Sequence, residues 1–305
     1  MSANKVEIFE VVARDGFQNE ARFVETADKI ALIDKLSQTG VAKIECTAFV
    51  SPKAVPNMRD AADVMAGIKR NAAVIYSALV PNLRGAEAAI ASGVQEVNLV
   101  FSASESHNKA NVRMTCEESL TALTTIVAAC TSARVPANVS IATSFGCPFE
   151  GMTPAARVLG FVERCVAMGV SGVTLADTTG MANPAQVEAL VGDVLARFPS
   201  LALTLHFHDT RGMGLANVFA AWRAGARRFD AALGGIGGCP FAPGATGNIC
   251  TEDTVHMFEQ MDVETGVNLP KLLEIAKTLP ALVGHDTFGA VLKAGRSCDL
   301  HPLPK

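Results

Sequence analysis

The sequence predicts an α/β fold, a (β/α)8 TIM barrel with additional C-terminal helices. Short apolar segments rich in Val and Ile alternate eight times with longer segments of helical periodicity, over roughly 230 residues. A weak internal repeat places a glycine before several of these apolar segments. An open doubly wound sheet would give similar local signals, but it normally carries a Gly-rich nucleotide-binding motif. Neither G-x-G-x-x-G nor G-x-x-x-x-G-K-[ST] occurs, so we favour the barrel.

The expected elements follow one another in strict alternation. The predicted strands are Val6–Val12, Val41–Cys46, Ala73–Leu79, Glu96–Phe101, Val139–Phe145, Gly172–Ala176, Ala202–Phe207 and Arg228–Leu233. The predicted helices between them include Ala27–Gln38, Asp60–Lys69, Cys116–Cys130, Pro154–Met168, Pro184–Arg197 and Leu215–Ala224. The glycines of the repeat lie where a helix ends and a strand begins, and there glycine adopts the left-handed conformation that ends a helix. They are Gly40, Gly93, Gly169 and Gly225.

The whole chain, 1–305, is expected to form a single catalytic domain. The barrel is predicted over about 5–250 and a C-terminal helical extension over about 251–305. A Gly/Pro-rich loop, GGIGGCPFAPGATGN, precedes helices expected around Thr251–Gln260 and Pro270–Leu279, and no linker-like composition separates a second domain. The extension is expected to cover the barrel or to contact a second subunit.

Composition restricts the partners and the compartment. Hydrophobic residues make up 49% and charged residues 18%, which excludes intrinsic disorder. The net charge is −4 and no Lys/Arg-rich run occurs, so we expect no nucleic-acid partner. No apolar stretch approaches the ~18 residues of a membrane span, and the first residues lack a signal-peptide apolar region. Eight cysteines without a C-x-x-C pair indicate reduced thiols, so we expect a cytoplasmic protein.

His206 and His208 form the most informative local motif. Residues i and i+2 of a strand point to the same side, so both imidazoles are expected at the barrel mouth, where one cation can bind both. The alternative is one core histidine and one surface histidine, but the pair ends a strand and precedes an Asp-Thr turn. With Asp15 and the amide oxygen of Asn248, the pair makes a mixed N/O set without thiolate. Such a set favours Mg²⁺ or Mn²⁺ over structural Zn²⁺.

Arg14 and Asp15 follow the first predicted strand directly. An adjacent Arg–Asp pair is often only a solvated turn, but this position lies at the functional face of a barrel. Arg14 can stabilise a developing enolate or carboxylate, and Gln18 in the same loop is a candidate substrate-binding residue. Glu45 ends an apolar strand, where an unpaired carboxylate is costly to bury. Its expected partner is Arg14 or a metal-bound water.

Cys239 is a candidate for proton transfer. It lies in the glycine-rich loop at the mouth, where a thiol can move with the loop and donate a proton if its pKa is tuned. The alternative is a small buried apolar residue, the usual fate of a cysteine. We give that structural interpretation to Cys147 and Cys250.

Motifs over nearly the whole chain make the sequence closely similar to the 3-hydroxy-3-methylglutaryl-CoA lyase family of metal-dependent lyase barrels. They are ARDGFQNE, IECTAFVSPKAVPNM, VPNLRGAEAAIASGVQEVN, SFGCPFEG, LADTTGMANP, HFHDTRGMGLAN and GGIGGCPFAPGATGNICTEDTVHM. The resemblance implies cleavage of 3-hydroxy-3-methylglutaryl-CoA (HMG-CoA) to acetyl-CoA and acetoacetate, in leucine degradation and ketone-body metabolism. It also implies an acyl-CoA thioester as substrate and a homodimer or larger homo-oligomer.

The resemblance assigns roles to the candidate residues. Mg²⁺ or Mn²⁺ is bound by the positions matching Asp15, His206, His208 and Asn248. The position matching Arg14 stabilises the enolate, the one matching Cys239 transfers a proton, and the one matching Glu45 lies in the catalytic cavity. Glu252 matches a further acidic residue near that cavity. Asn98, Ser102 and Ser104 are possible CoA contacts by position alone.

Three residues depart from the family pattern: Ala21 stands for a Lys, Ala54 for a bulky aromatic residue and Arg211 for a Tyr. An added cation and a smaller side chain near the mouth suggest an alternative function. This is a lyase or aldolase of the same superfamily that acts on a related 3-hydroxyacyl-CoA with a different C3 substituent. The rival functions are a condensing synthase, a hydrolase barrel and a catalytically silent binding protein. A condensing synthase would usually carry an additional regulatory domain. A hydrolase barrel would need more histidines at strand ends, and a silent binding protein would be expected to have lost Arg14 or Cys239.

Overall fold

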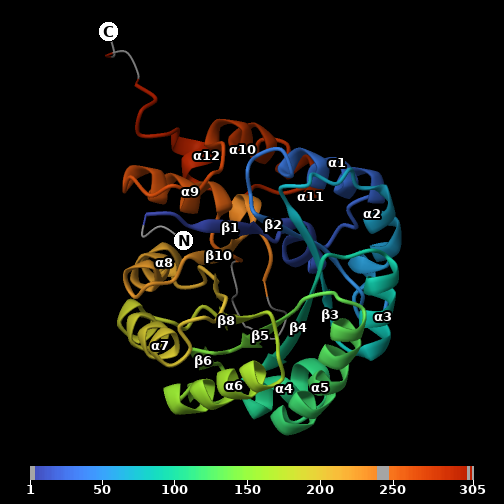
Figure 1. Cartoon of the computed structure of the whole chain (residues 1–305). Coiled ribbons are helices and arrows are strands. Elements are labelled where there is room, and N and C mark those ends of the chain that lie inside the picture. The colour runs from blue at the N-terminus through green and yellow to red at the C-terminus, as the bar shows by residue number, and fades with distance from the viewer. Residues whose placement is uncertain (1–3, 239–246, 301–302, 304–305) are drawn as a thin grey trace.

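The computed structural model describes residues 4–238, 247–300 and 303, and it confirms the predicted barrel (Figure 1). Eight parallel strands close in the order β1-β10-β9-β8-β5-β4-β3-β2, and a short antiparallel pair, β6 and β7, lies outside the barrel. The barrel strands are β1 (Glu7–Glu10), β2 (Lys43–Ala48), β3 (Ile75–Val80), β4 (Glu96–Ser102), β5 (Ala137–Ala142), β8 (Gly172–Asp177), β9 (Leu203–Phe207) and β10 (Arg228–Ala231). The outside pair is β6 (Gly146–Cys147) and β7 (Gly151–Met152).

Helices surround the barrel on all sides in Figure 1. They are α1 (Thr26–Leu36), α2 (Ala61–Gly67), α3 (Leu83–Ala91), α4 (Glu105–Val112), α5 (Cys116–Ser132), α6 (Ala155–Ala167), α7 (Pro184–Arg197), α8 (Gly214–Arg223), α9 (Thr251–Gln260), α10 (Leu269–Ala276), α11 (Leu279–Val283) and α12 (Ala290–Ala294). α9 contacts α8 and β1, while α10 lies against α9 and α1, so the chain after β10 completes the ring of helices. Within the described residues, no helix is both long and apolar enough to cross a membrane.

Local sequence explains where several helices begin and end. The hydroxyl of Thr115 accepts from the backbone N–H of Glu118, and the Glu118 side chain accepts in return, which makes a capping box at the start of α5. Asn183 caps α7 ahead of a proline at the first helical position. The four glycines of the predicted repeat all have positive φ, as helix-terminating residues require. The values are 94° at Gly40, 74° at Gly93, 79° at Gly169 and 110° at Gly225.

The first strand is shorter than predicted. The sequence predicted a strand over Val6–Val12, whereas β1 ends at Glu10 and Val12–Gly16 form one π-helical turn. The carbonyl of Val11 accepts from the backbone N–H groups of Arg14, Asp15 and Gly16, at 3.1, 2.7 and 3.3 Å, and thereby closes the turn. π-helical turns are rare and often occur at functional sites. Here the turn carries Arg14 and Asp15.

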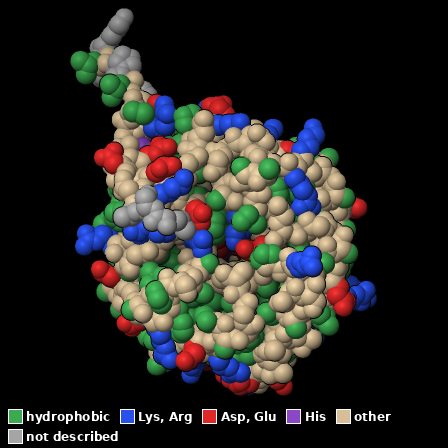
Figure 2. All heavy atoms as spheres, in the orientation of Figure 1, with side chains coloured by type: hydrophobic (Ala, Val, Ile, Leu, Met, Phe, Trp, Pro, Cys, Tyr) green, Lys and Arg blue, Asp and Glu red, His purple; other side chains and the backbone are tan. Residues whose placement is uncertain are grey.

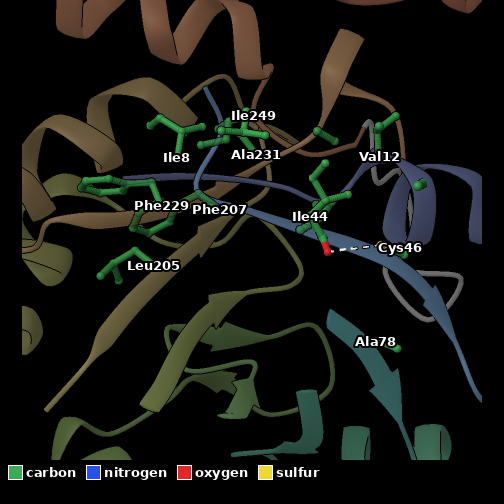
Figure 3. Packing of buried hydrophobic residues seen from close by; sticks show 14 of the residues in the cluster. Ile8, Val12, Ile44, Cys46, Ala78, Leu205, Phe207, Phe229, Ala231 and Ile249 are labelled. Carbon is green, nitrogen blue, oxygen red and sulfur yellow. Dashed lines mark hydrogen bonds between the residues drawn. The ribbon is translucent and has the colours of Figure 1, made fainter. Parts of the chain in front are cut away.

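Side chains alternate between the two faces of each strand, and the two faces differ in chemistry. Apolar residues pack between the strands and the surrounding helices, as Figure 3 shows for Ile8, Ile44, Leu205 and Phe229. The alternate positions face a narrow polar cavity inside the barrel. They include Lys43, Glu45, Ser77, Glu96, Asn98, Asn138, Thr174 and Asp230. The polar barrel interior is the base on which the pocket at the mouth is built.

Candidate functional site

A pocket of about 760 Å³ opens at the carboxyl ends of the barrel strands. The space-filling view shows a hollow at the centre of the barrel, with acidic and basic side chains inside it (Figure 2). The titratable side chains of the lining include Arg14, Asp15, His206, His208 and Asp230. Carboxyl-terminal strand ends are where barrel enzymes place their active sites. The structure thus brings most of the sequence-predicted site residues to one pocket.

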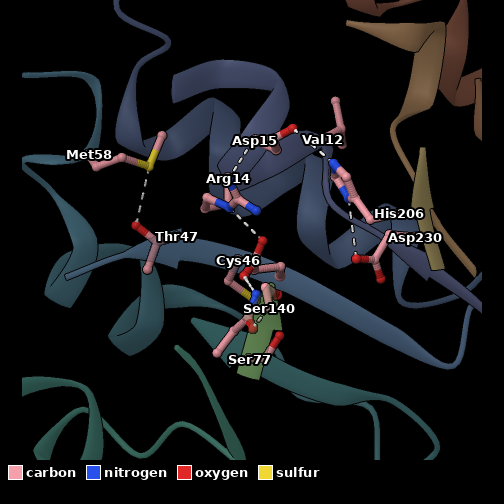
Figure 4. A network of polar contacts seen from close by, with 12 residues as sticks. Val12, Arg14, Asp15, Cys46, Thr47, Met58, Ser77, Ser140, His206 and Asp230 are labelled. Atoms are coloured by element: carbon pink, nitrogen blue, oxygen red, sulfur yellow. Dashed lines mark hydrogen bonds and ion pairs between the residues drawn. The ribbon is translucent and has the colours of Figure 1, made fainter. Parts of the chain in front are cut away.

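Arg14 lies between two carboxylates. Its Nε donates to Oε2 of Glu45 at 2.5 Å, and a terminal guanidinium nitrogen contacts the Asp15 carboxylate (Figure 4). Of the two partners anticipated for Glu45, the structure therefore shows Arg14. Both ion pairs are almost fully buried, so neither is screened strongly by water.

Asp15, His206 and His208 converge on one point. One carboxylate oxygen and one ring nitrogen from each histidine all lie within 4.8 Å of one another. The two Nε2 atoms face each other at 3.0 Å, and each lies about 4 Å from Oδ2 of Asp15, at 4.0 Å for His206 and 3.9 Å for His208. This is the arrangement predicted from the H-x-H motif, with both imidazoles facing the mouth.

Asn248, the last residue of the glycine-rich segment, also contacts this cluster. Its backbone forms an antiparallel bridge with His208, and its Nδ2 donates to Oδ2 of Asp15 at 2.7 Å. Its Oδ1 is buried and has no hydrogen-bond partner within the described part of the chain. A buried acceptor without a donor is costly, and a cation satisfies it. The four residues therefore fit an oxygen- and imidazole-preferring divalent ion such as Mg²⁺ or Mn²⁺.

Neighbouring charges keep Arg14 and Asp15 ionised despite their burial. Burial alone would lower the pKa of Arg14, but the carboxylates of Asp15 and Glu45 outweigh it and raise the pKa above its ordinary value. Burial would likewise raise the pKa of Asp15, but Arg14 and the two histidines hold that pKa well below its usual range. Both groups are therefore charged at neutral pH.

The two histidines differ because, among the described residues, an acidic side chain contacts the second ring nitrogen of His206 but not that of His208. Nδ1 of His206 lies 3.3 Å from Oδ2 of Asp230. This contact, with the charges of Asp15 and Asp230, overcomes burial and raises the pKa of His206. Burial and the neighbouring His206 lower the pKa of His208 to about 3. His208 is thus neutral, which leaves a lone pair for a metal ion.

The remaining predicted residues lie in different parts of the molecule. Gln18 and Asn98 line the pocket, whereas Ser102 and Ser104 are buried beside α4. Cys147 and Cys250 are buried, in agreement with their structural interpretation. Glu252 is buried behind the loop and accepts from the backbone N–H of Gly234. Cys239 lies outside the described residues.

Sequence reasoning missed two residues of the pocket. Asp230 lies inside β10 and was not a candidate, although its register partner is His206. The alternation Arg228, Asp230 in an apolar strand was the signal that could have found it. His107 does not lie at a predicted strand end, yet it lines the pocket from α4. Arg211, read as an added cation at the mouth, instead donates to the carbonyls of Thr179 and Gly180, both at 2.9 Å.

Comparison with known proteins adds a family and several relatives. A family model described as HMGL-like matches residues 5–279. The chain is 47% identical over 280 residues to the hydroxymethylglutaryl-CoA lyase of Bacillus subtilis, which covers 92% of this chain and 94% of that protein. It is 43% identical over 300 residues to the (R)-citramalyl-CoA lyase of Chloroflexus aurantiacus, with 95% of each chain covered.

A solved structure is also similar over the full length. It is an HMG-CoA lyase from Acinetobacter baumannii in complex with coenzyme A and 3-methylmalate, with a TM-score of 0.96 and 51% sequence identity. The match covers 100% of this chain and 99% of that one.

Proposed function

The chain belongs to the HMGL-like family, and on that premise we propose that it is a carbon–carbon lyase that cleaves HMG-CoA to acetyl-CoA and acetoacetate. One observation carries the proposal beyond the family match. Asp15, His206 and His208 converge within 4.8 Å beside the buried Arg14–Glu45 ion pair, in a pocket large enough for an acyl group. The cluster joins a cation site to a fixed positive charge, which is what cleavage to an enolate requires.

Asp15, His206, His208 and Asn248 would hold the divalent ion, and Mg²⁺ or Mn²⁺ is the ion we propose. When bound, the ion supplies Lewis-acid activation of the substrate's C3 hydroxyl. Asp230 orients the imidazole of His206 through Nδ1, which leaves Nε2 for the ion.

The reaction begins when a carboxylate or imidazole of this cluster acts as the base and takes the proton from the C3 hydroxyl oxygen. The C2–C3 bond then breaks, a carbonyl forms at C3 to give acetoacetate, and the bonding pair passes into the thioester as an enolate. The guanidinium of Arg14 opposes the negative charge on the enolate oxygen. Because Glu45 and Asp15 already hold Arg14, little reorganisation is needed as that charge develops. A proton added at C2 then gives acetyl-CoA.

We propose Cys239 as the proton donor, or as the residue that positions a donating water, from its place in the glycine-rich loop. Cys239→Ala is expected to lose most turnover while metal affinity stays near that of wild type, because sulfur is not a proposed ligand. Isothermal titration with Mg²⁺ and a steady-state assay measure the two effects. A fully active variant would move proton transfer to water or to Glu45.

Further assignments belong to the proposal. We propose an acyl-CoA thioester as the bound partner, with Gln18 contacting the substrate, and a homodimer or larger assembly. The eight cysteines without a C-x-x-C pair support a reducing, cytoplasmic location. Leucine degradation and ketone-body metabolism are the processes that this reaction would serve.

The test is a substrate panel with purified protein and Mg²⁺. HMG-CoA should release acetyl-CoA and acetoacetate in equal amounts, faster than any 3-hydroxyacyl-CoA with another C3 substituent. (R)-citramalyl-CoA, the substrate named for the Chloroflexus relative, is the sharpest comparison. Preferential cleavage of that thioester would replace the proposed substrate but keep the reaction class. No cleavage of any thioester would reject the lyase proposal.

A further inference from the structure

A line of side-chain hydrogen bonds crosses the barrel interior beneath the charged cluster. Nδ2 of Asn98 donates to Oε1 of Glu45 at 2.8 Å. Oδ1 of Asn98 accepts from Nδ2 of Asn138 at 3.0 Å and from the hydroxyl of Ser140 at 2.9 Å. Asn138 donates in addition to Oγ1 of Thr174 at 3.0 Å. The line therefore runs from β2 through β4 and β5 to β8.

This interior differs from the usual filling of such barrels, which is layers of Val, Ile and Leu. A buried amide is costly unless its donors and acceptors are satisfied. Asn98 and Asn138 are register partners on neighbouring strands, so their side chains meet without distortion. Asn98, Asn138 and Ser140 each donate to an acceptor in the line, which offsets the cost of burying these polar groups.

The line leaves the Asn98 amide one orientation. Its oxygen accepts from two donors, so its NH₂ group must face Glu45. That bond occupies Oε1 of Glu45 and leaves Oε2 for Nε of Arg14. Asn98 is thus linked to the guanidinium of Arg14 through a single residue, Glu45.

Arg14 has two competing acidic partners, Glu45 and Asp15. A carboxylate held at one oxygen cannot rotate freely, so Glu45 retains the guanidinium at its own side of the pocket. Without that restraint Glu45 can turn away, and Arg14 is left to pair with Asp15 alone. That change would move the positive charge toward the metal ligand and away from the floor of the pocket.

We propose that Asn98 is a positioning residue: it fixes Glu45 and thereby aims Arg14 at the oxygen of the developing enolate. The inference rests on the proposed lyase function for its kinetic consequence, but the placement of Arg14 can be tested without turnover. Asn98 acts through Glu45, so its effect must depend on the Glu45 carboxylate.

The kinetic test compares Asn98→Ala with wild type on HMG-CoA and Mg²⁺. The expected loss of kcat is about tenfold or more, the size of one hydrogen bond to a charged group, while KM and Mg²⁺ affinity change by less than about twofold. Ser77→Ala is the matched control. Ser77 pairs in register with Glu45 and faces the same interior, but its hydroxyl contacts the carbonyl of Ile44, so kcat should stay near wild type.

A double-mutant cycle separates positioning from a general loss of structure. In the Glu45→Ala background, adding Asn98→Ala should cost less than about twofold, because the residue it acts through is already gone. The same fold loss in both backgrounds, an effect on KM alone, or an unchanged kcat in Asn98→Ala would each overturn the proposal.

Nuclear magnetic resonance of the Arg14 side chain tests the placement without activity. The Arg14 Nε–H, assigned by its loss in Arg14→Gln, should exchange slowly with solvent in wild type and in Ser77→Ala. It should exchange measurably faster in Asn98→Ala. Unchanged exchange there would overturn the proposal even in a folded variant. A wild-type protein inactive on HMG-CoA would reject the proposed function, and this measurement would still decide the role of Asn98.

Discussion

The barrel contains two groups of buried carboxylates, an inner group (Asp15 and Glu45) and an outer group (Glu10 and Glu252), and their partners differ in charge. Inside the barrel mouth, Asp15 and Glu45 face the guanidinium of Arg14. Behind the mouth, Glu10 and Glu252 accept hydrogen bonds from backbone N–H groups and one hydroxyl. The donors are the N–H groups of Val12, Leu233 and Gly234 and the hydroxyl of Thr251.

Burial is similar in the two groups, but the pKa of Asp15 and those of Glu10 and Glu252 are shifted in opposite directions. The pKa of Asp15 lies below its ordinary range because Arg14 and the histidines outweigh burial. Burial raises the pKa of Glu10 to about 7 and that of Glu252 to about 8, since neutral donors only partly offset it. A facing cation, and not burial, decides whether a carboxylate here stays ionised.

The two groups also do different work. The inner carboxylates hold a charge and a cation site ready for chemistry. Glu10 ties Val12, at the start of the π-helical turn, to Leu233 and Thr251, at the two ends of the segment that carries Asn248. Glu10 therefore holds in place the turn that bears Asp15 and the segment that bears Asn248.

Removing the positive charge of Arg14 gives the largest expected effect on turnover. Arg14→Gln should lower kcat and kcat/KM together by about 10²- to 10³-fold, because the enolate charge it opposes exists only after bond cleavage begins. Arg211→Gln is the control, since Arg211 donates to the carbonyls of Thr179 and Gly180 and is not among the residues that line the pocket. A rise in KM alone in Arg14→Gln would reduce Arg14 to a carboxylate-binding residue. Steady-state kinetics on HMG-CoA distinguish the two.

The support of the cation site comes next. Asp230→Ala removes the acceptor from Nδ1 of His206 and should weaken Mg²⁺ affinity by about 10- to 100-fold. Isothermal titration measures the change, and Asp193→Ala on the exposed face of α7 serves as a control. Equal affinities in both variants would show that Asp230 does not orient the ligand.

How much of this site is predictable differs from residue to residue. The H-x-H pair, Arg14 and Asp15 stand out because polar groups directly follow apolar strands, and barrel chemistry collects at strand ends. Asp230 lies within β10, and only the register with β9 shows that it meets His206. Glu10 resembles any strand carboxylate until barrel closure shows that it faces Thr251 and Leu233.

The fold shows the same division between features that local sequence predicts and features that depend on distant contacts. Strand number, order of elements and the helix-ending glycines are local properties, so alternation and periodicity predict them. The end of β1 also depends on distant residues, because the Glu10 carboxylate binds Val12 together with Leu233 and Thr251. At this point the expected strand end over Val12 becomes a helical turn. The hydrogen-bonded interior around Asn98 likewise depends on which strands become neighbours.

The outer group gives the smallest effect, on stability and not on turnover. The pKa of Glu252 is raised in the folded state, so its contribution to stability is full below pH ~4.5 and is lost as pH rises toward about 8. Glu252→Gln should remove that decline, so that its Tm exceeds that of wild type more at pH 8 than at pH 5. Glu259→Gln, on the exposed face of α9, should leave the profile unchanged. Parallel Tm profiles for wild type and Glu252→Gln would contradict the raised pKa.

The central claim is that HMG-CoA cleavage depends on the cation site, and removing and restoring the metal ion tests it most directly. Protein stripped with a chelator is assayed for acetyl-CoA release before and after Mg²⁺ or Mn²⁺ is added back, for wild type and for His208→Ala. Wild type should be inactive when stripped and recover with metal, and His208→Ala should stay inactive at the same metal concentration while remaining folded. Full activity of wild type with the chelator present throughout would contradict the metal-dependent mechanism.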